Sequence, residues 1–107
     1  MTTAPKSEVL KMAELAAYQD GSVVSRQITK ADAGNVTLFA FDKDQELSEH
    51  TAPFDALVQV LEGDAEIRIS GKPYHLGTGD AIIMPADEPH AVFALQRFKM
   101  LLTMIRK

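Results

Sequence analysis

Turn-forming residues interrupt this 107-residue chain at short intervals, and their spacing limits the length of every secondary-structure element. Glycine stands beside a small or polar residue at Asp20-Gly21, Gly34-Asn35, Gly63-Asp64, Gly71-Lys72 and Gly79-Asp80. The segments between these turns are short and rich in β-branched and aromatic residues, which is typical of strands. We therefore predict about nine short strands in an all-β antiparallel sandwich or barrel, rather than strands that alternate with helices.

The predicted strands follow runs of branched or alternating apolar residues. They cover residues 23–29, 36–41, 46–52, 56–61, 65–70, 73–76, 81–84, 90–95 and 100–105. The first two strands are expected to form one hairpin, and Gly71-Lys72 a second, tight one. Residues 9–18 suit a short helical turn instead, and the polar residues 1–7 are expected to be a frayed end. The chain is then one domain, residues 1–107.

Composition argues against several classes of protein. The chain has 11 Lys and Arg against 15 Asp and Glu, and its basic residues are scattered, which argues against nucleic-acid binding. The one local basic excess, Arg97, Lys99, Arg106 and Lys107, is expected to form a solvated tip. There is no cysteine, and no apolar segment approaches membrane-spanning length. We expect a cytoplasmic protein that binds neither nucleic acid nor a membrane.

Strand alternation makes two histidines candidates for a site. If His90 faces inward, Val92 and Ala94 face inward with it, whereas Phe93 faces the opposite way. His50 shares a face of its own predicted strand with Ala52. We expect both imidazoles to line the open end of the barrel.

Two predicted strands are apolar on both faces. Residues 56–61 are apolar except for Gln59, and residues 100–105 are apolar except for Thr103. A small two-layer barrel cannot cover both faces of such strands by itself. We therefore predict a homodimer that buries one sheet face.

Residues 46–94 carry two spaced motifs. His50, Ala52, Ala56 and Gly63 stand where a first motif reads His-x-His, three or four residues, Glu, six residues, Gly. Gly79, Pro85, Asp87, His90 and Ala94 stand where a second reads Gly, five residues, Pro-x-Gly, two residues, His, three residues, Asn. With these spacings the chain resembles the small single-domain cupins. The resemblance implies a double-stranded β-helix, or jelly-roll, barrel, here with a short N-terminal helical turn.

The resemblance also implies a reduced metal site. Cupins usually hold a metal ion through three histidines and one carboxylate, whereas only His50 and His90 match here, because Ala52 and Ala56 replace the other two ligands. Two neutral imidazoles would hold Fe, Mn, Ni or Zn weakly, with water or substrate completing the shell. The replacements should leave an apolar pocket around the histidines. Its predicted lining is Ala52, Ala56, Val58, Val60, Ile83, Met84 and Val92.

Three functions are compatible with such a site. The first is binding of a small organic ligand by His50 and His90, with or without a loosely held divalent metal. The second is a metal-dependent dioxygenase or isomerase, and the third is a non-catalytic sensor or partner-binding module. Asp55 and Glu49 are expected to point away from the metal, and His75 to be exposed and uninvolved.

Overall fold

The predicted strand segments fold into two antiparallel sheets. A computed structural model describes residues 3–106 and contains nine strands in that range, which confirms the predicted all-β class. In chain order they are β1 (Val23–Ala31), β2 (Gly34–Phe41), β3 (Glu46–His50), β4 (Phe54–Glu62), β5 (Asp64–Ile69), β6 (Lys72–Gly77), β7 (Ala81–Met84), β8 (His90–Ala94) and β9 (Phe98–Arg106). A 3-10 helix, η1 (Met12–Glu14), lies inside the segment predicted to form a helical turn.

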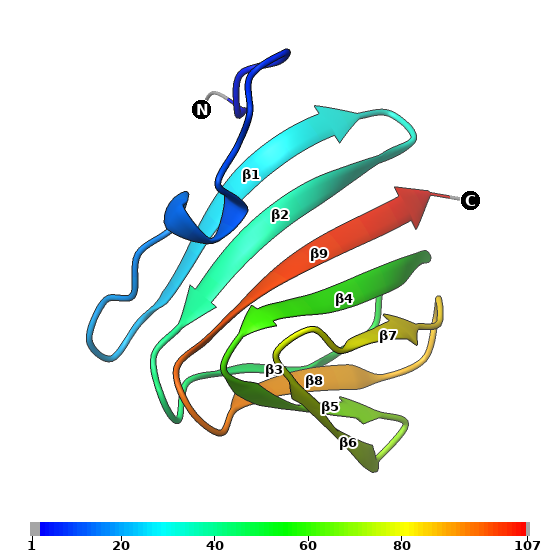
Figure 1. Cartoon of the computed structure of the whole chain (residues 1–107). Coiled ribbons are helices and arrows are strands. Elements are labelled where there is room, and N and C mark those ends of the chain that lie inside the picture. The colour runs from blue at the N-terminus through cyan, green and yellow to red at the C-terminus, as the bar shows by residue number, and fades with distance from the viewer. Residues whose placement is uncertain (1–2, 107) are drawn as a thin grey trace.

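The sheets lie face to face as two layers (Figure 1). One sheet has the strand order β1-β2-β9-β4-β7, and the other has the order β3-β8-β5-β6. Both predicted hairpins are confirmed, since β1 pairs with β2 and β5 with β6. No helix within residues 3–106 has the length and apolar character needed to cross a membrane.

The main core fills the space between the sheets. Alternate residues of each strand point inward, so one face of every strand contributes to a single apolar cluster. Its buried members are Phe41, Ala56, Val58, Val60, Ala65, Ile67, Leu76, Met84, Val92, Ala94, Phe98 and Met100. The rings of Phe41 and Phe98 stack with centroids 4.5 Å apart, which joins β2 to the start of β9.

The N-terminal segment packs on the outer face of the five-stranded sheet. Ala4 is 8% exposed, and its amide donates a hydrogen bond to the Ile28 carbonyl at 2.9 Å. Leu15 and Ala16 join a second apolar cluster with Leu38 and other outward residues of this sheet. The predicted frayed end, residues 1–7, is therefore wrong at Ala4, whereas residues 5–7 are exposed and Met1 and Thr2 lie outside the described residues. An alanine and a few apolar side chains attach the segment to the sheet, because the sheet face beneath them is itself apolar.

The predicted solvated basic tip is also wrong for Lys99. Lys99 is 9% exposed and donates a hydrogen bond to the Ala13 carbonyl. Arg97 is exposed, as predicted, and donates hydrogen bonds to Asp42 at 2.7 Å and to Asp20 at 2.6 Å. Both cations also lie over the Tyr18 ring. These side chains fasten the N-terminal segment to β9. Arg106 is exposed, as predicted, and Lys107 lies outside the described residues.

Candidate functional site

The two candidate histidines lie on neighbouring strands of the four-stranded sheet. His50 ends β3 and His90 begins β8, and the two residues are direct partners in the antiparallel pairing. His90 is 5% exposed and Val92 is 2% exposed, which confirms that they face inward. The side chain of His50 meets that of His90 from the exposed edge strand. The fold thus brings together two residues that are 40 positions apart in the chain.

The two imidazole rings face each other through their Nε2 atoms. The Nε2 atoms of His50 and His90 are 3.1 Å apart, and the rings are nearly perpendicular, at 69°. Each Nδ1 atom faces the carbonyl oxygen of the residue two positions earlier: Ser48 at 2.7 Å for His50, and Glu88 at 3.2 Å for His90. A carbonyl oxygen only accepts hydrogen bonds, so making both of these bonds assigns the proton of each ring to Nδ1. In the neutral state, both Nε2 atoms are then unprotonated.

Two unprotonated nitrogens at this distance point their lone pairs at each other. A metal cation between the two atoms would remove the repulsion between these lone pairs. Burial lowers the pKa of His90 from its ordinary value of 6.5, and the positive charge that His50 can carry lowers it further, although the hydrogen bond to Glu88 opposes both effects. The neutral form of His90 is therefore favoured near pH 7.

The separation of the nitrogens fits two ligands of one metal ion. Nitrogens bound to a metal at about 2.0–2.1 Å lie about 2.8–3.4 Å apart when the angle between the bonds is about 90–110°. The observed 3.1 Å falls within that range. Within residues 3–106, no group of three or more His, Cys, Asp or Glu side chains is placed to hold a metal. The donor set is thus two neutral imidazoles, which fits a weakly held divalent ion.

The apolar positions predicted to line a pocket belong to the core. Ala56, Val58, Met84 and Val92 are between 0 and 3% exposed and pack in the main apolar cluster, and Val60 lies there too. Their contact with a ligand therefore stays a prediction, as does that of the partly exposed Ala52. Ile83 was predicted wrongly, because its side chain is 61% exposed. Its neighbours Ile82 and Met84 face the core, so strand alternation turns Ile83 outward.

Three other polar residues lie apart from the imidazole pair. The exposed Asp55 accepts a hydrogen bond from the Ala86 amide at 2.9 Å. Glu49 is exposed. The His75 side chain is 63% exposed and contacts Asp64 at 3.1 Å, which confirms the prediction that it is exposed. Sequence reasoning missed the carbonyl groups of Ser48 and Glu88, because a backbone acceptor can belong to any residue type.

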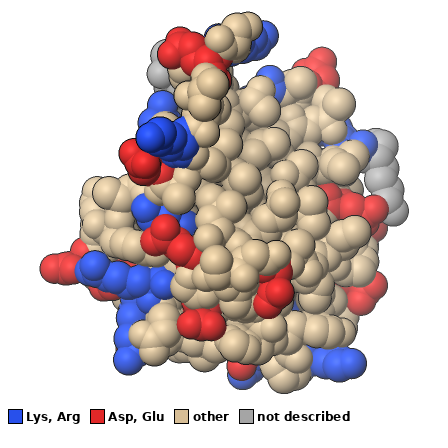
Figure 2. Space-filling view, viewed as in Figure 1, with Lys and Arg blue, Asp and Glu red and all other residues tan. Residues whose placement is uncertain are grey.

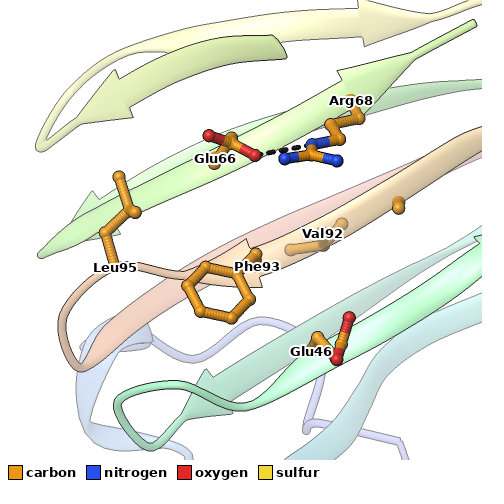
Figure 3. Close-up of a pocket in the computed structure, with 7 residues that line it drawn as sticks. Glu46, Glu66, Arg68, Val92, Phe93 and Leu95 are labelled. Carbon is orange, nitrogen blue, oxygen red and sulfur yellow. Dashed lines mark hydrogen bonds and ion pairs between the residues drawn. The ribbon is translucent and has the colours of Figure 1, made fainter. Parts of the chain in front are cut away.

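A hollow of about 310 Å³ lies on the outer face of the four-stranded sheet, on the side opposite the core (Figure 3). Phe93 lines it, as expected from its parity, and Glu66 and Arg68 form an ion pair at 2.7 Å beside it (Figure 3). His90 faces inward from the same strand, β8. The hollow is thus separate from the imidazole pair.

Comparisons with known proteins agree with this fold. Residues 37–105 match the model of the cupin domain family. A conserved protein of unknown function from Streptococcus pyogenes is 33% identical, with a TM-score of 0.92 over 100% of this chain and 96% of that one. A cupin superfamily protein from Desulfitobacterium hafniense is 27% identical, with a TM-score of 0.91 over 99% and 97%. A cupin 2 conserved barrel domain protein from Leptotrichia buccalis is 37% identical, with a TM-score of 0.88 over 91% of this chain and 47% of that one. No curated protein matches the sequence.

Proposed function

Since this chain belongs to the cupin domain family, we propose that it binds a divalent metal ion through Nε2 of His50 and Nε2 of His90 and holds a small organic ligand there. One observation carries the proposal. The two Nε2 atoms lie 3.1 Å apart while both Nδ1 atoms face backbone carbonyls. A divalent cation between the rings would remove the repulsion between the lone pairs.

The ligand set leaves room for a small molecule. Two protein nitrogens occupy only part of the coordination shell of Fe, Mn, Ni or Zn, so water or an organic ligand must supply the other donors. A metal held in this way can act as a Lewis acid on an oxygen of the bound ligand. The part of this chain is to orient the two imidazoles, to keep His90 largely out of water, and to close the inner side of the site with apolar residues.

Metal titration of the untagged protein tests this function. We expect wild-type protein to bind about one equivalent of at least one of Fe(II), Mn(II), Ni(II) and Zn(II) in isothermal titration calorimetry, with modest affinity. His50→Ala and His90→Ala should each abolish that binding. His75→Ala is the matched control, because His75 is the remaining histidine and its side chain is 63% exposed. Absence of binding by wild-type protein for all four metals, or binding that survives in both site variants, would contradict the proposal.

The same chain, we propose, forms a homodimer through the outer face of β9, β4 and β7. Leu57, Ile83 and Ile105 face outward there, and the last two are each 61% exposed. Leu57 lies directly opposite Ile83 in the pairing of β4 with β7. In the space-filling view of Figure 2, acidic and basic side chains lie mostly toward the margins of the molecule, and the centre is largely uncharged. Burying such a surface in a second copy removes apolar area from water.

A further inference from the structure

The loop of residues 85–89 connects the two sheets and leads directly into His90. It leaves β7 of the five-stranded sheet and enters β8 of the four-stranded sheet. Asp87 adopts a positive φ of 65° within it, a conformation that is uncommon for a residue other than glycine and that surrounding contacts must maintain. The path of this loop sets the position of His90 at the start of β8 and decides which groups face its ring.

Three segments from elsewhere in the fold bind this loop. The Ala86 amide donates to Oδ1 of Asp55 on β4 at 2.9 Å. The Asp87 amide donates to the carbonyl of Ala52, two residues after His50, at 2.8 Å. Ser70, at the turn after β5, donates from its amide to the Pro89 carbonyl at 2.7 Å and from its hydroxyl to Glu88 Oε1 at 3.0 Å.

These bonds act on the imidazole pair through the backbone. The Glu88 carbonyl accepts the Nδ1 proton of His90, so its position decides which His90 nitrogen is left unprotonated. The bond from Asp87 to Ala52 also ties the loop to the segment that follows His50. A loop free to move would allow His90 to turn its ring or change tautomer, and the two Nε2 atoms would then no longer meet.

Asp55 itself is not aimed at the site. It precedes Ala56, which is 3% exposed and faces the core, so strand alternation points the Asp55 side chain to the outer side of β4. Its carboxylate reaches the loop amide instead. An effect of Asp55 on the imidazoles must therefore pass through Ala86 and the loop.

We infer that Asp55 and Ser70 are positioning residues, which hold the loop of residues 85–89 so that the Glu88 carbonyl fixes the tautomer of His90 and directs its Nε2 at His50. Partners that orient metal-binding histidines commonly change metal affinity by about 10–100-fold when they are removed. The effect on metal affinity rests on the function proposed above. The effect on the His90 tautomer does not, because it concerns the protein without metal.

Three variants and two measurements test the inference. In Asp55→Asn the amide oxygen can still accept the Ala86 proton, whereas Asp55→Ala has no acceptor. Ser70→Gly removes the hydroxyl but suits the Ser70 φ of 49° better than alanine would. Two-bond ¹H–¹⁵N spectra of the metal-free protein at about pH 8.5, where histidine is neutral, report the His90 tautomer. Calorimetric titration with Zn(II) or Ni(II) reports affinity.

Wild-type protein and Asp55→Asn should show His90 protonated on Nδ1 and should bind metal within about twofold of each other. Asp55→Ala should show a mixture of tautomers and bind about tenfold more weakly or worse. Ser70→Gly should shift the tautomer in the same direction by a smaller amount, since the Ser70 amide bond remains. The inference is overturned if the Asp55→Ala and Ser70→Gly spectra both match wild type, or if Asp55→Asn is as impaired as Asp55→Ala. If no protein binds metal but the tautomer shifts as expected, the inference stands and the proposed function fails.

Discussion

His50 lies opposite His90 because β3 contains one extra residue relative to β8. Leu47 pairs with Val92, and the next matched pair is His50 with His90, so three steps along β3 correspond to two along β8. An uninterrupted ladder would have placed Glu49 opposite His90. The irregularity is a β-bulge, a feature that commonly redirects side chains near functional sites. It allows Leu47 to pack against the core while His50, three residues later, turns toward His90.

Adding a carboxylate at Ala56 should strengthen metal binding. Ala56 faces inward at the position where the cupin motif carries glutamate, and it is 3% exposed. We expect Ala56→Glu to bind divalent metal more tightly than wild type in calorimetric titration. Without metal, the longer side chain should cost about 1–3 kcal/mol of unfolding free energy. The matched control is Gln59→Glu on the exposed face of the same strand, and equal affinity in the two variants would refute the expectation.

Stability should fall in mild acid because of His90. Its folded-state pKa lies below the ordinary 6.5, so between these two values the unfolded chain binds more protons than the folded one. The free energy of unfolding should therefore decrease as the pH falls through about 6.5, and this contribution should level off below the folded-state pKa. Urea denaturation from pH 8 to pH 5 measures the slope. His90→Gln should reduce it and His75→Gln should not, whereas an unchanged slope in His90→Gln would contradict the assignment.

Lys99 should stabilise the attachment of the N-terminal segment. Lys99→Met keeps most of the apolar stem but loses the hydrogen bond to the Ala13 carbonyl and the contact with the Tyr18 ring. We expect a loss of about 1–3 kcal/mol in unfolding free energy, and faster amide exchange at Ala4. Lys30→Met is the control, because Lys30 is exposed and its substitution should change stability by less than about 0.5 kcal/mol. Equal effects of the two substitutions would count against a special role for Lys99.

Two glycines with positive φ should differ in their tolerance of alanine. Gly63 has φ 92° and Gly71 has φ 82°, so both substitutions carry similar backbone strain. A Cβ at Gly63 would collide with the Arg97 carbonyl and with Phe98, whereas one at Gly71 would meet open space. Chemical denaturation should show a cost of about 1–2 kcal/mol for Gly71→Ala. Gly63→Ala should cost more than about 4 kcal/mol or fail to fold, and similar costs for the two would disprove the close approach.

The proposed dimer should depend on the apolar strip of β4 and β7. Leu57→Glu or Ile83→Glu would place a carboxylate in a buried apolar contact, which is strongly unfavourable. Light scattering at micromolar concentration should then give a monomer mass for these variants and a dimer mass for wild type. Val9→Glu is the control, since Val9 is 97% exposed and outside the strip. A monomeric wild-type protein would contradict the proposal.

The sequence alone determined the strands, the turns and the inward orientation of the His90 side chain. Glycine, proline and aspartate break the chain locally, and alternation along a strand needs no knowledge of distant residues. For this reason the hairpins and the inward face of His90, Val92 and Ala94 could be predicted. The convergence of His50 with His90 followed from the spacing of the family motifs, and the structure confirms the contact, although what it binds stays a prediction.

Only the tertiary structure decided the features that depend on segments meeting across the fold. The bulge that puts His50 in place of Glu49 opposite His90 becomes visible only when β3 and β8 are paired. Burial of Ala4 and Lys99 depends on an apolar sheet face formed by strands far away in sequence. The bonds from Asp55 and Ser70 to the loop before His90 join residues 31 and 18 positions apart. Such contacts leave no periodic signal in the chain, because they are fixed by packing and backbone hydrogen bonding rather than by local residue pattern.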